Sequence, residues 1–344
     1  MRADEVRRLV VASDLHLDAS PDPARRDGGA AFTRFLASIV LPDDRPGARL
    51  LLLGDTFELA DASANGDGHA IARMNEIAGA HPRLLATLLE CLRRGWRLDI
   101  VPGNHDMALT RSAVQRRLIR LLGTAAHRMR IHPWLYHVPG VLYAEHGHQH
   151  HDLNRFPTVL APDDPRRPDR LFVPPLGAWT GKVSARLLRA FVDSRRGEFR
   201  VRSPAYRARI AEVEPRLALP RDVVSQLHGL SRFRFRSTAV RLARRALNLP
   251  AARQPDGYLI AAAGRIHSVL SEVGRDVPVY AFGHTHHART VRLADGAWYV
   301  NTGTWTADVR GAGPDRDDPD LYPYLDITVG TADIVPAIRY WRRT

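Results

Sequence analysis

The sequence is poor in the residues that mark secreted and membrane proteins. It has 344 residues and a single cysteine, Cys91, which excludes an internal disulfide. No run approaches the roughly 18 consecutive apolar residues that a membrane-spanning helix needs. Without disulfides, and without a segment that resembles a secretory signal peptide, the chain is expected to be cytoplasmic. Cys91 lies in the apolar helical pattern "LLECLRRGW" and is expected to be a buried hydrophobic residue.

Lysine is almost absent as well, so arginine carries the positive charge. Lys182 is the only lysine among 50 basic residues, and the formal net charge is +13. Residues 151–255 contain 22 basic and 9 acidic residues, whereas the rest of the chain contains 28 of each sign. Genome composition explains a preference for arginine over lysine, but it does not explain why one segment holds the whole excess. A concentrated positive charge of this kind favours contact with anions.

Outside that segment, short apolar strands alternate with helices. This order predicts parallel βαβ units in an α/β fold. The expected strands are "RLVVAS" (8–13), "RLLLLGD" (49–55) and "RLDIVPGNHD" (97–106), and the expected helices cover 30–41 and 81–96. Residues 128–148 are typical of further β-structure. A helix over 256–274 leads to the strand "PVYAFGH" (278–284), and later strands are expected at 289–293, 297–303 and 324–329.

The segment 152–255 differs in texture from the rest of the chain. Prolines cluster at 157–175, and two arginine-rich stretches, 181–196 and 237–249, have apolar residues at helical spacing. We therefore predict one α/β core, made of residues 1–151 and 256–344, with a helical, basic insertion at 152–255 that acts as a lid or cap.

Polar clusters follow the expected strands where each strand ends. In α/β sheets, ligands bind beyond the carboxyl ends of strands. Carboxylate, amide and imidazole groups without thiolate suit Mn, Fe or Zn. Seven candidates are too many for one zinc ion but suit two ions that share a carboxylate. These candidate metal ligands are Asp14, His16, Asp55, Asn104, His146, His284 and His286.

Each cluster alone also has a simpler interpretation. An isolated Asp-x-His or Gly-Asp is ordinary turn chemistry, and "GNHD" could begin a helix with Asn104 or Asp106 as its cap. His148 is an alternative to His146 as a ligand, and Glu58 either supports the site or favours a helix dipole. Asn301 and Thr302 either line the pocket or simply end a strand. The remaining nearby histidines are expected to lie outside the ligand set: His150, His151 and His287.

Taken together, the clusters resemble a known family. "SDLHL" (13–17), "GDTFE" (54–58), "GNHD" (103–106), "HGH" (146–148) and "GHTH" (283–286) are similar, in order, to the five-part signature of the calcineurin-like metallophosphoesterases. The resemblance covers about 200 residues outside the insertion. It implies a two-sheet α/β-β/α metallophosphoesterase sandwich flanked by helices, which here carries the arginine-rich insertion.

The resemblance also implies roles for the residues. Two divalent metal ions, with Mn²⁺ as first choice and Fe or Zn as alternatives, would share Asp55. One ion would bind Asp14, His16, Asp55 and His286, and the other would bind Asp55, Asn104, His146 and His284. His105 would contact the phosphate and protonate the leaving oxygen, and Asp106 would orient His105. The implied reaction is in-line attack by a hydroxide that bridges the metals on a phosphate ester or pyrophosphate.

Within the family, "SDLHL" and "GDTFE" are nearest in style to the branch that contains the UDP-2,3-diacylglucosamine pyrophosphatases. That branch also inserts a helical lid between the fourth and fifth motifs. It carries arginine after the motif-three asparagine, however, whereas this chain has His105, and the interval from His146 to His284 is longer here. The substrate is therefore left open as an anionic phosphate compound.

The basic insertion has three interpretations: a solvated cap, a lid that touches anionic lipid at the inner face of the membrane, or a nucleic-acid groove. Scattered aromatic residues without a stacking platform make the third less favoured. A nuclease of the same superfamily and a non-catalytic binding scaffold remain alternative functions, and the oligomeric state is not predicted.

Overall fold

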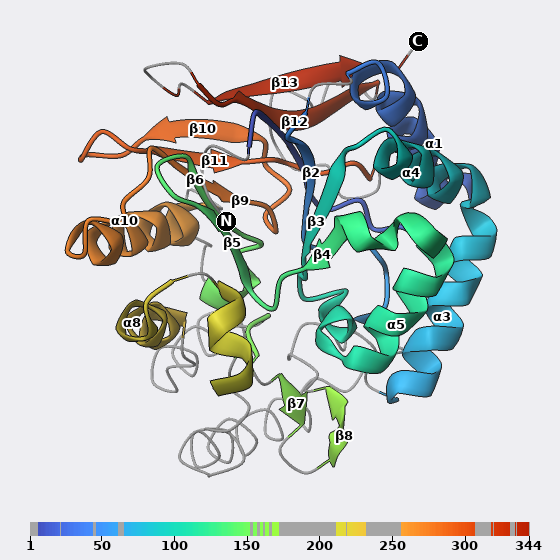
Figure 1. Ribbon diagram of the computed structural model, residues 1–344, viewed down its shortest axis with the longest axis horizontal. Helices are drawn as coiled ribbons and strands as arrows, with labels where there is room; N and C mark the ends of the chain where they lie inside the picture. Colours follow the sequence, from blue (N-terminus) through green and yellow to red (C-terminus); the bar gives the residue numbers. More distant parts are fainter. Residues whose placement is uncertain are drawn as a thin grey trace, which may run out of the picture.

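In the computed structural model, two mixed β-sheets pack face to face and helices cover their outer sides (Figure 1). This arrangement is the α/β two-sheet sandwich expected from the sequence. The structure describes residues 6–20, 22–43, 46–60, 65–151, 154–156, 159–160, 162–164, 167–171, 211–217, 219–231, 256–306, 318, 320–330, 334 and 336–343.

The larger sheet has the strand order β13-β12-β1-β2-β3-β4. Its strands β1 to β4 run parallel, as the alternation of strands and helices predicted, while β12 and β13 add an antiparallel edge. The strands are β1 (Arg8–Ala12), β2 (Ala48–Leu53), β3 (Arg97–Val101), β4 (Met129–Ile131), β12 (Leu321–Thr328) and β13 (Ala337–Arg342).

The smaller sheet has the order β10-β11-β9-β6-β5. Its central strands β6, β9 and β11 are parallel, and each edge strand is antiparallel to its neighbour. The strands are β5 (Leu135–Val138), β6 (Leu142–Glu145), β9 (Val279–Phe282), β10 (Arg289–Arg292) and β11 (Trp298–Asn301).

Alternation along the strands builds the apolar layers. In β1, Leu9 and Val11 face the layer between the sheets, whereas Val10 and Ala12 face the helices. This period of two is the basic geometry of a strand, and burial on both faces explains why the strand reads as a continuous apolar run.

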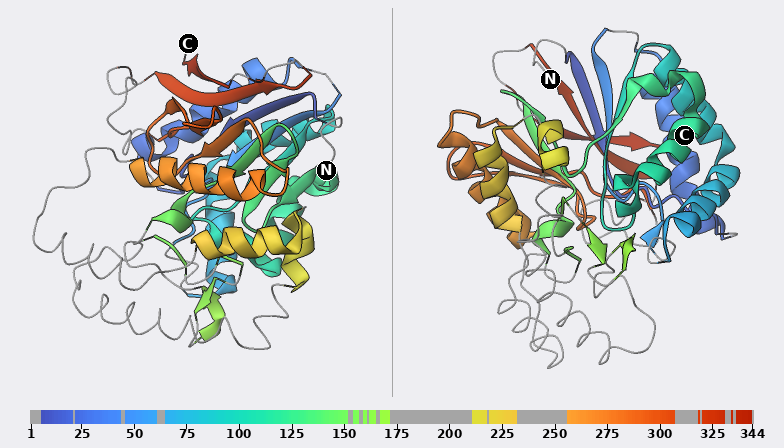
Figure 2. Two further views of the ribbon diagram at one scale, coloured as in Figure 1. Left: turned by 90° about the vertical axis from the view of Figure 1, so that its left-hand side faces the viewer. Right: turned by 60° about the horizontal axis from the view of Figure 1, so that its bottom comes forward.

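Helices α1, α3, α4 and α5 cover the outer face of the larger sheet, and α10 lies on the smaller one (Figures 1 and 2). In place of the helix expected over 30–41, the structure has α1 and, directly after it, a π-helical turn. The helix expected over 81–96 ends earlier, because Gly95 takes a left-handed φ of 105°. The helix expected from Asp256 is α10. The helical segments are α1 (Pro23–Phe35), η2 (Leu36–Val40), α3 (Asp67–Ala80), α4 (Pro82–Arg93), η3 (Met107–Thr110), α5 (Ser112–Leu122), η4 (Gly123–Arg128), η5 (His148–His150) and α10 (Gly257–Ser271).

Part of the arginine-rich insertion is described. A short hairpin, β7 (Asp163–Asp164) with β8 (Arg167–Leu171), lies within the proline-rich stretch 157–175, and η6 (Glu214–Leu217) leads to helix α8 (Arg221–Ser231). The two amphipathic stretches 181–196 and 237–249 lie outside the described residues. The boundaries at 151/152 and 255/256 therefore stay a prediction.

Helix α8 packs against the core. Val223, Val224 and Leu227 are buried and belong to the same apolar cluster as the helices of the larger sheet. The His228 ring lies 6.3 Å from that of Trp134, between centroids. This stretch of the insertion thus shares the main hydrophobic core. Across the described residues, no helix combines the length and apolar character needed to cross a bilayer.

The buried position of Leu227, 1 % exposed, leads to a stability prediction. Leu227→Ala should lower the free energy of unfolding by about 2–5 kcal/mol, because it removes buried methyl groups and leaves a cavity. Gln226→Ala, on the exposed face of α8, should change it by less than about 0.5 kcal/mol. Urea unfolding of the full chain measures both. If Leu227→Ala leaves the main transition where it is, α8 is not part of the cooperative core.

Candidate metal centre

The candidate ligands follow the carboxyl ends of five parallel strands: β1, β2 and β3 of the larger sheet, and β6 and β9 of the smaller one. Backbone hydrogen bonds tie neighbouring segments, such as Asp14 N–H to Gly54 O at 3.0 Å and Gly283 N–H to His146 O at 3.1 Å. The two sheets are joined where His284 N–H donates to Asp14 Oδ2 at 3.1 Å. The site therefore lies where both sheets end together.

The backbone at these positions is unusual. Of the residues that the structure describes, five non-glycine residues have a positive φ, and all five are candidate ligands: Asp14 (54°), His16 (46°), Asp55 (49°), His284 (70°) and His286 (64°). A left-handed φ is uncommon for residues with a side chain, and strain of this kind gathers at functional sites. At each of these positions, the conformation turns the backbone sharply after the strand, so that the side chain faces the site.

Two motif glycines leave room for the carboxylates. A β-carbon at Gly103 would overlap Asp55 Oδ1, and one at Gly283 would lie 2.5 Å from Asp14 Oδ2. Glycine is therefore required before Asn104 and before His284 because a carboxylate already occupies that space.

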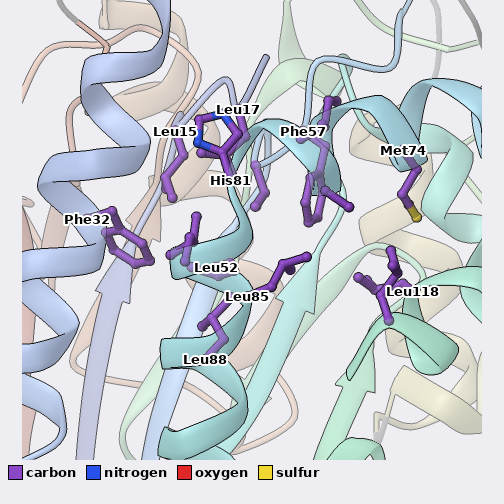
Figure 3. Close-up of a pocket in the computed structure, with 15 residues that line it drawn as sticks. Leu15, Leu17, Phe32, Leu52, Phe57, Met74, His81, Leu85, Leu88 and Leu118 are labelled. Carbon is purple, nitrogen blue, oxygen red and sulfur yellow. The ribbon is translucent and has the colours of Figure 1, made fainter. Parts of the chain in front are cut away.

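Apolar residues anchor the first two ligand loops. Leu15 and Leu17 flank His16, and Phe57 lies between Asp55 and Glu58. All three point into a small apolar pocket of ≈ 20 Å³ between the sheet and its helices (Figure 3). Leu17 and Phe57 also form a parallel β-bridge. With the apolar side chains facing inward, His16 and Glu58 are left on the polar side.

The first ligand group consists of Asp14, His16 and His286. Asp14 is fully buried, and its Oδ1 lies 3.1 Å from His286 Nε2 and 3.9 Å from His16 Nε2. The two imidazole Nε2 atoms are 3.4 Å apart. One carboxylate oxygen and two ring nitrogens thus converge on one small volume.

The second group consists of Asp55, His146 and His284. Asp55 Oδ2 lies 3.0 Å from His146 Nε2. His146 Nδ1 donates to the carbonyl of Leu53 at 2.9 Å, so Nε2 is the nitrogen that could bind a metal once it has lost its proton. Asn104 belongs to the same loop as His105, and its buried Oδ1 makes no hydrogen bond.

Several atoms that could bind a metal are buried without hydrogen-bond partners, and they show whether the site fits a cation. Asp14 Oδ1, Asn104 Oδ1 and His146 Nε2 all belong to this class. His146 Nε2 lies 3.0 Å from Asp55 Oδ2, and both residues belong to the second ligand group. Buried polar atoms are normally satisfied, so oxygen and nitrogen donors left open in this way fit a divalent cation.

The electrostatics agree with that fit. Burial alone would favour the neutral form of Asp55, but the charges of His146 and His105 hold its pKa well below the usual range. Burial alone would lower the pKa of His146, but Asp55 and Asp14 raise it to about 9. Without a metal, a proton on His146 offsets part of the charge of the two buried carboxylates. Burial and the charge of His146 hold the pKa of His284 well below its usual value. Metal binding would release the proton of His146.

The structure places Glu58, rather than Asp106, at His105. His105 Nδ1 lies 2.7 Å and 2.9 Å from the two oxygens of Glu58. The Asp106 carboxylate instead accepts backbone N–H groups of Gly103, Asp55, Thr56 and Phe57 at 2.6–3.3 Å. The orienting role expected for Asp106 stays a prediction. In the structure, Asp106 joins the second and third ligand loops, and it makes no side-chain cap for the helical turn that follows.

Glu58 also reaches His16, whose Nδ1 lies 3.1 Å from Glu58 Oε2. The pKa of Glu58 falls to about 2, because hydrogen bonds and charge from His105 and His16 outweigh burial. Burial alone would lower the pKa of His105, but the charge of Asp55 and the hydrogen bond to Glu58 raise it to about 10. His105 also forms a third possible ligand group with His16 and Asp55.

The other flagged residues lie around the ligands. His148 is buried beside His146, and neither ring nitrogen makes a hydrogen bond. His150 contacts Glu145 at 2.5 Å, and the His151 ring lies 5.4 Å from that of His284. Asn301 donates to Gly283 O, and Thr302 to Ser13 Oγ, so both brace the ligand loops. His287 is partly buried.

One neighbour of the site was not expected. The side-chain nitrogen of Asn154 lies 3.2 Å from His284 Nε2. No strand precedes Asn154 and no motif includes it, so the sequence alone carried no signal for this contact.

Asp55→Asn should weaken binding of both cations by more than about 10-fold. Loss of a residue that only hydrogen-bonds to a ligand already costs about 10-fold or more, and loss of a shared ligand should cost more than that. Mn²⁺ titration calorimetry of the metal-stripped full chain checks this. Asp276→Asn, an exposed carboxylate at the opposite end of β9, is the matched control. Unchanged metal stoichiometry and affinity in Asp55→Asn would exclude Asp55 as the shared ligand.

No family model matches the sequence, and the search of curated proteins found no match. Among solved structures, a predicted phosphoesterase from Streptococcus pneumoniae TIGR4 has 9 % identity and a TM-score of 0.32, with 98 % of each chain covered. A dimetal phosphatase from Danio rerio has 12 % identity and a TM-score of 0.41, covering 97 % of this chain and 96 % of its own. A phosphopantetheinyl hydrolase from Mycobacterium tuberculosis has 15 % identity and a TM-score of 0.29, covering 86 % and 89 %. At such identities and TM-scores, these likenesses assign no activity to this chain.

Proposed function

We propose that this chain is a phosphoester hydrolase that depends on two divalent metal ions. The observation that carries the proposal is the position of one atom, Asp55 Oδ2. It lies 3.0 Å from His146 Nε2 of the second ligand group and 3.9 Å from His16 Nε2 of the first. One carboxylate therefore stands between two sets of donors, as a shared ligand must.

The ligand assignment follows from the two groups. Asp14, His16, Asp55 and His286 would hold one cation, and Asp55, Asn104, His146 and His284 would hold the other. Nitrogen and oxygen donors without thiolate favour Mn²⁺, with Fe or Zn as alternatives. When bound, such a pair supplies an acidified water and positive charge for phosphate oxygens.

His105 and Glu58 would handle the proton. Glu58 engages Nδ1 of His105, so Nε2 is the nitrogen that can face a leaving group. The His105 side chain is 32 % exposed and stacks edge-on against His16 at 4.7 Å between ring centroids. A proton held at Nε2 therefore lies beside the ligand group and within reach of solvent, where a departing oxygen could take it.

The open side of the site suits an anionic phosphate substrate. The side chains of His16 and His286 are 13 % and 18 % exposed, whereas those of Asp14 and Asp55 are buried. Imidazole rings thus face the open side, and the carboxylates lie beneath them. Contact of the insertion with anionic lipid, in preference to nucleic acid, stays a prediction.

A substrate screen tests the function. The full chain, stripped of metal and reloaded with Mn²⁺, is offered phosphomonoesters, phosphodiesters and nucleotide-sugar pyrophosphates. We expect hydrolysis of at least one class that requires the added metal. Tight metal binding with no hydrolysis of any class would point to a binding scaffold instead.

His105→Ala should retain both metals and lower kcat by about 10²–10⁴-fold for a substrate with a poor leaving group. A nitrophenyl ester, whose leaving group needs less protonation, should lose less. Glu58→Gln should follow the same pattern more weakly, and Glu76→Gln, an exposed glutamate on α3, should behave like the parent. Loss of metal from His105→Ala would make His105 a ligand, and equal losses on both substrates would remove its role as an acid.

A further inference from the structure

Three of the candidate ligand imidazoles have a polar partner at one ring nitrogen. His16 Nδ1 contacts Glu58, and His146 Nδ1 donates to Leu53 O. His284 Nε2 contacts the side-chain amide of Asn154 at 3.2 Å. A partner of this kind decides which nitrogen carries the proton and which can bind a metal.

The amide of Asn154 can meet His284 in two ways. If its NH₂ group donates to Nε2, that lone pair is used and the proton lies on Nδ1, so neither nitrogen is free for a cation. If the amide turns by 180°, Oδ1 accepts Nε2–H and Nδ1 keeps its lone pair. Amide nitrogen and oxygen exchange places with almost no change in shape. Only the second arrangement allows His284 to act as a ligand through its ring.

We propose that Asn154 is a positioning residue for the metal centre, which accepts Nε2–H of His284 and so presents Nδ1 to the cation. This inference rests on the proposed function in one respect, namely that His284 is a metal ligand. It adds a residue from outside the five motifs, and it places the first residues of the predicted insertion in the support of the ligand set.

The surrounding loop is built to hold Asn154 in place. Gln149, which is 1 % exposed, clamps the backbone of Phe156 from both sides, with Nε2 donating to O at 2.7 Å and Oε1 accepting from N–H at 3.1 Å. The backbone N–H of Asn154 donates to His151 O at 3.2 Å. The backbone of Asn154 is therefore held by its loop, and only the rotation of its side chain remains free.

Variants of residue 154 that differ in their ability to donate or accept a hydrogen bond distinguish the two arrangements. Asn154→Ala removes any partner, whereas Asn154→Asp keeps an acceptor and cannot donate. If Asn154 accepts from His284, Asn154→Ala should weaken Zn²⁺ or Mn²⁺ binding by about 10–100-fold. Asn154→Asp should bind at least as tightly as the parent. Asn75→Ala, an exposed amide on α3, is the matched control and should not change affinity.

Two measurements on the full chain decide the matter without any substrate. Calorimetry with Mn²⁺ gives the affinities, and ¹⁵N–¹H spectra of the histidine rings in the Zn²⁺-loaded protein identify the protonated nitrogen of His284, assigned by comparison with His284→Gln. We expect a proton on Nε2 in the parent and in Asn154→Asp. Equal metal affinity in parent and Asn154→Ala, weak binding by Asn154→Asp, or a proton on Nδ1 would each overturn the proposal.

The outcomes also separate this inference from the proposed function. If the parent binds metal in this pattern but hydrolyses no phosphate ester, the function fails while the role of Asn154 stands. If Asn154→Ala binds metal normally but binds inorganic phosphate more weakly than the parent, Asn154 is a phosphate contact, and the positioning role is overturned while the function stands.

Discussion

Burial of two carboxylates, Asp14 and Asp55, at the junction of the two sheets is the constraint on which the site depends. Isolated buried anions are strongly unfavourable, and each needs partners of opposite charge. The chain meets this need in two ways. Backbone N–H groups of His284 and His105 donate to these carboxylates, and imidazoles surround the remaining oxygens. Among them, His146 can carry a proton, or release it to bind a cation, so one residue could balance the buried charge without metal and act as a ligand with it.

This requirement explains the unusual backbone. Five of the seven candidate ligands, which follow β1, β2 and β9, take a positive φ, and this conformation turns the chain toward the site directly after those strands. The strain is held by the surroundings: Thr304 Oγ and Trp305 N–H both donate to the Asp14 carbonyl. Asp106 joins the second loop to the third through three backbone N–H groups of the second loop. Ligand geometry is therefore set before any cation arrives, which lowers the cost of ordering it.

The sequence predicted the parts of the molecule that leave a pattern in neighbouring residues. Apolar runs followed by Asp14, Asp55 and Asn104 predicted parallel strands with polar ends, because a buried strand and a ligand loop each leave a local pattern. The contacts of Glu58 with His105 and of Asn154 with His284 depend on distances between loops in space. The spacing of residues along the sequence does not indicate these distances. The buried ion pair of Arg49 with Asp99 at 3.1 Å, between neighbouring strands of the larger sheet, could not be predicted for the same reason. Helix boundaries moved where Gly95 or a π-turn changed the backbone.

The insertion and the metal centre are connected at both ends of the inserted segment. At its start, the turn η5 and Asn154 follow His146 directly and return to His284. At its end, α10 follows the insertion and leads into β9, whose carboxyl end carries His284. Helix α8 lies beside both α10 and η5, within one apolar core. A movement of α8 would therefore be felt by the two segments that hold the second ligand group, since packed interiors transmit displacement rather than absorb it. For that reason, α8 and the segments that carry the candidate ligands of the second group form one packed unit, and a displacement of one is expected to shift the others.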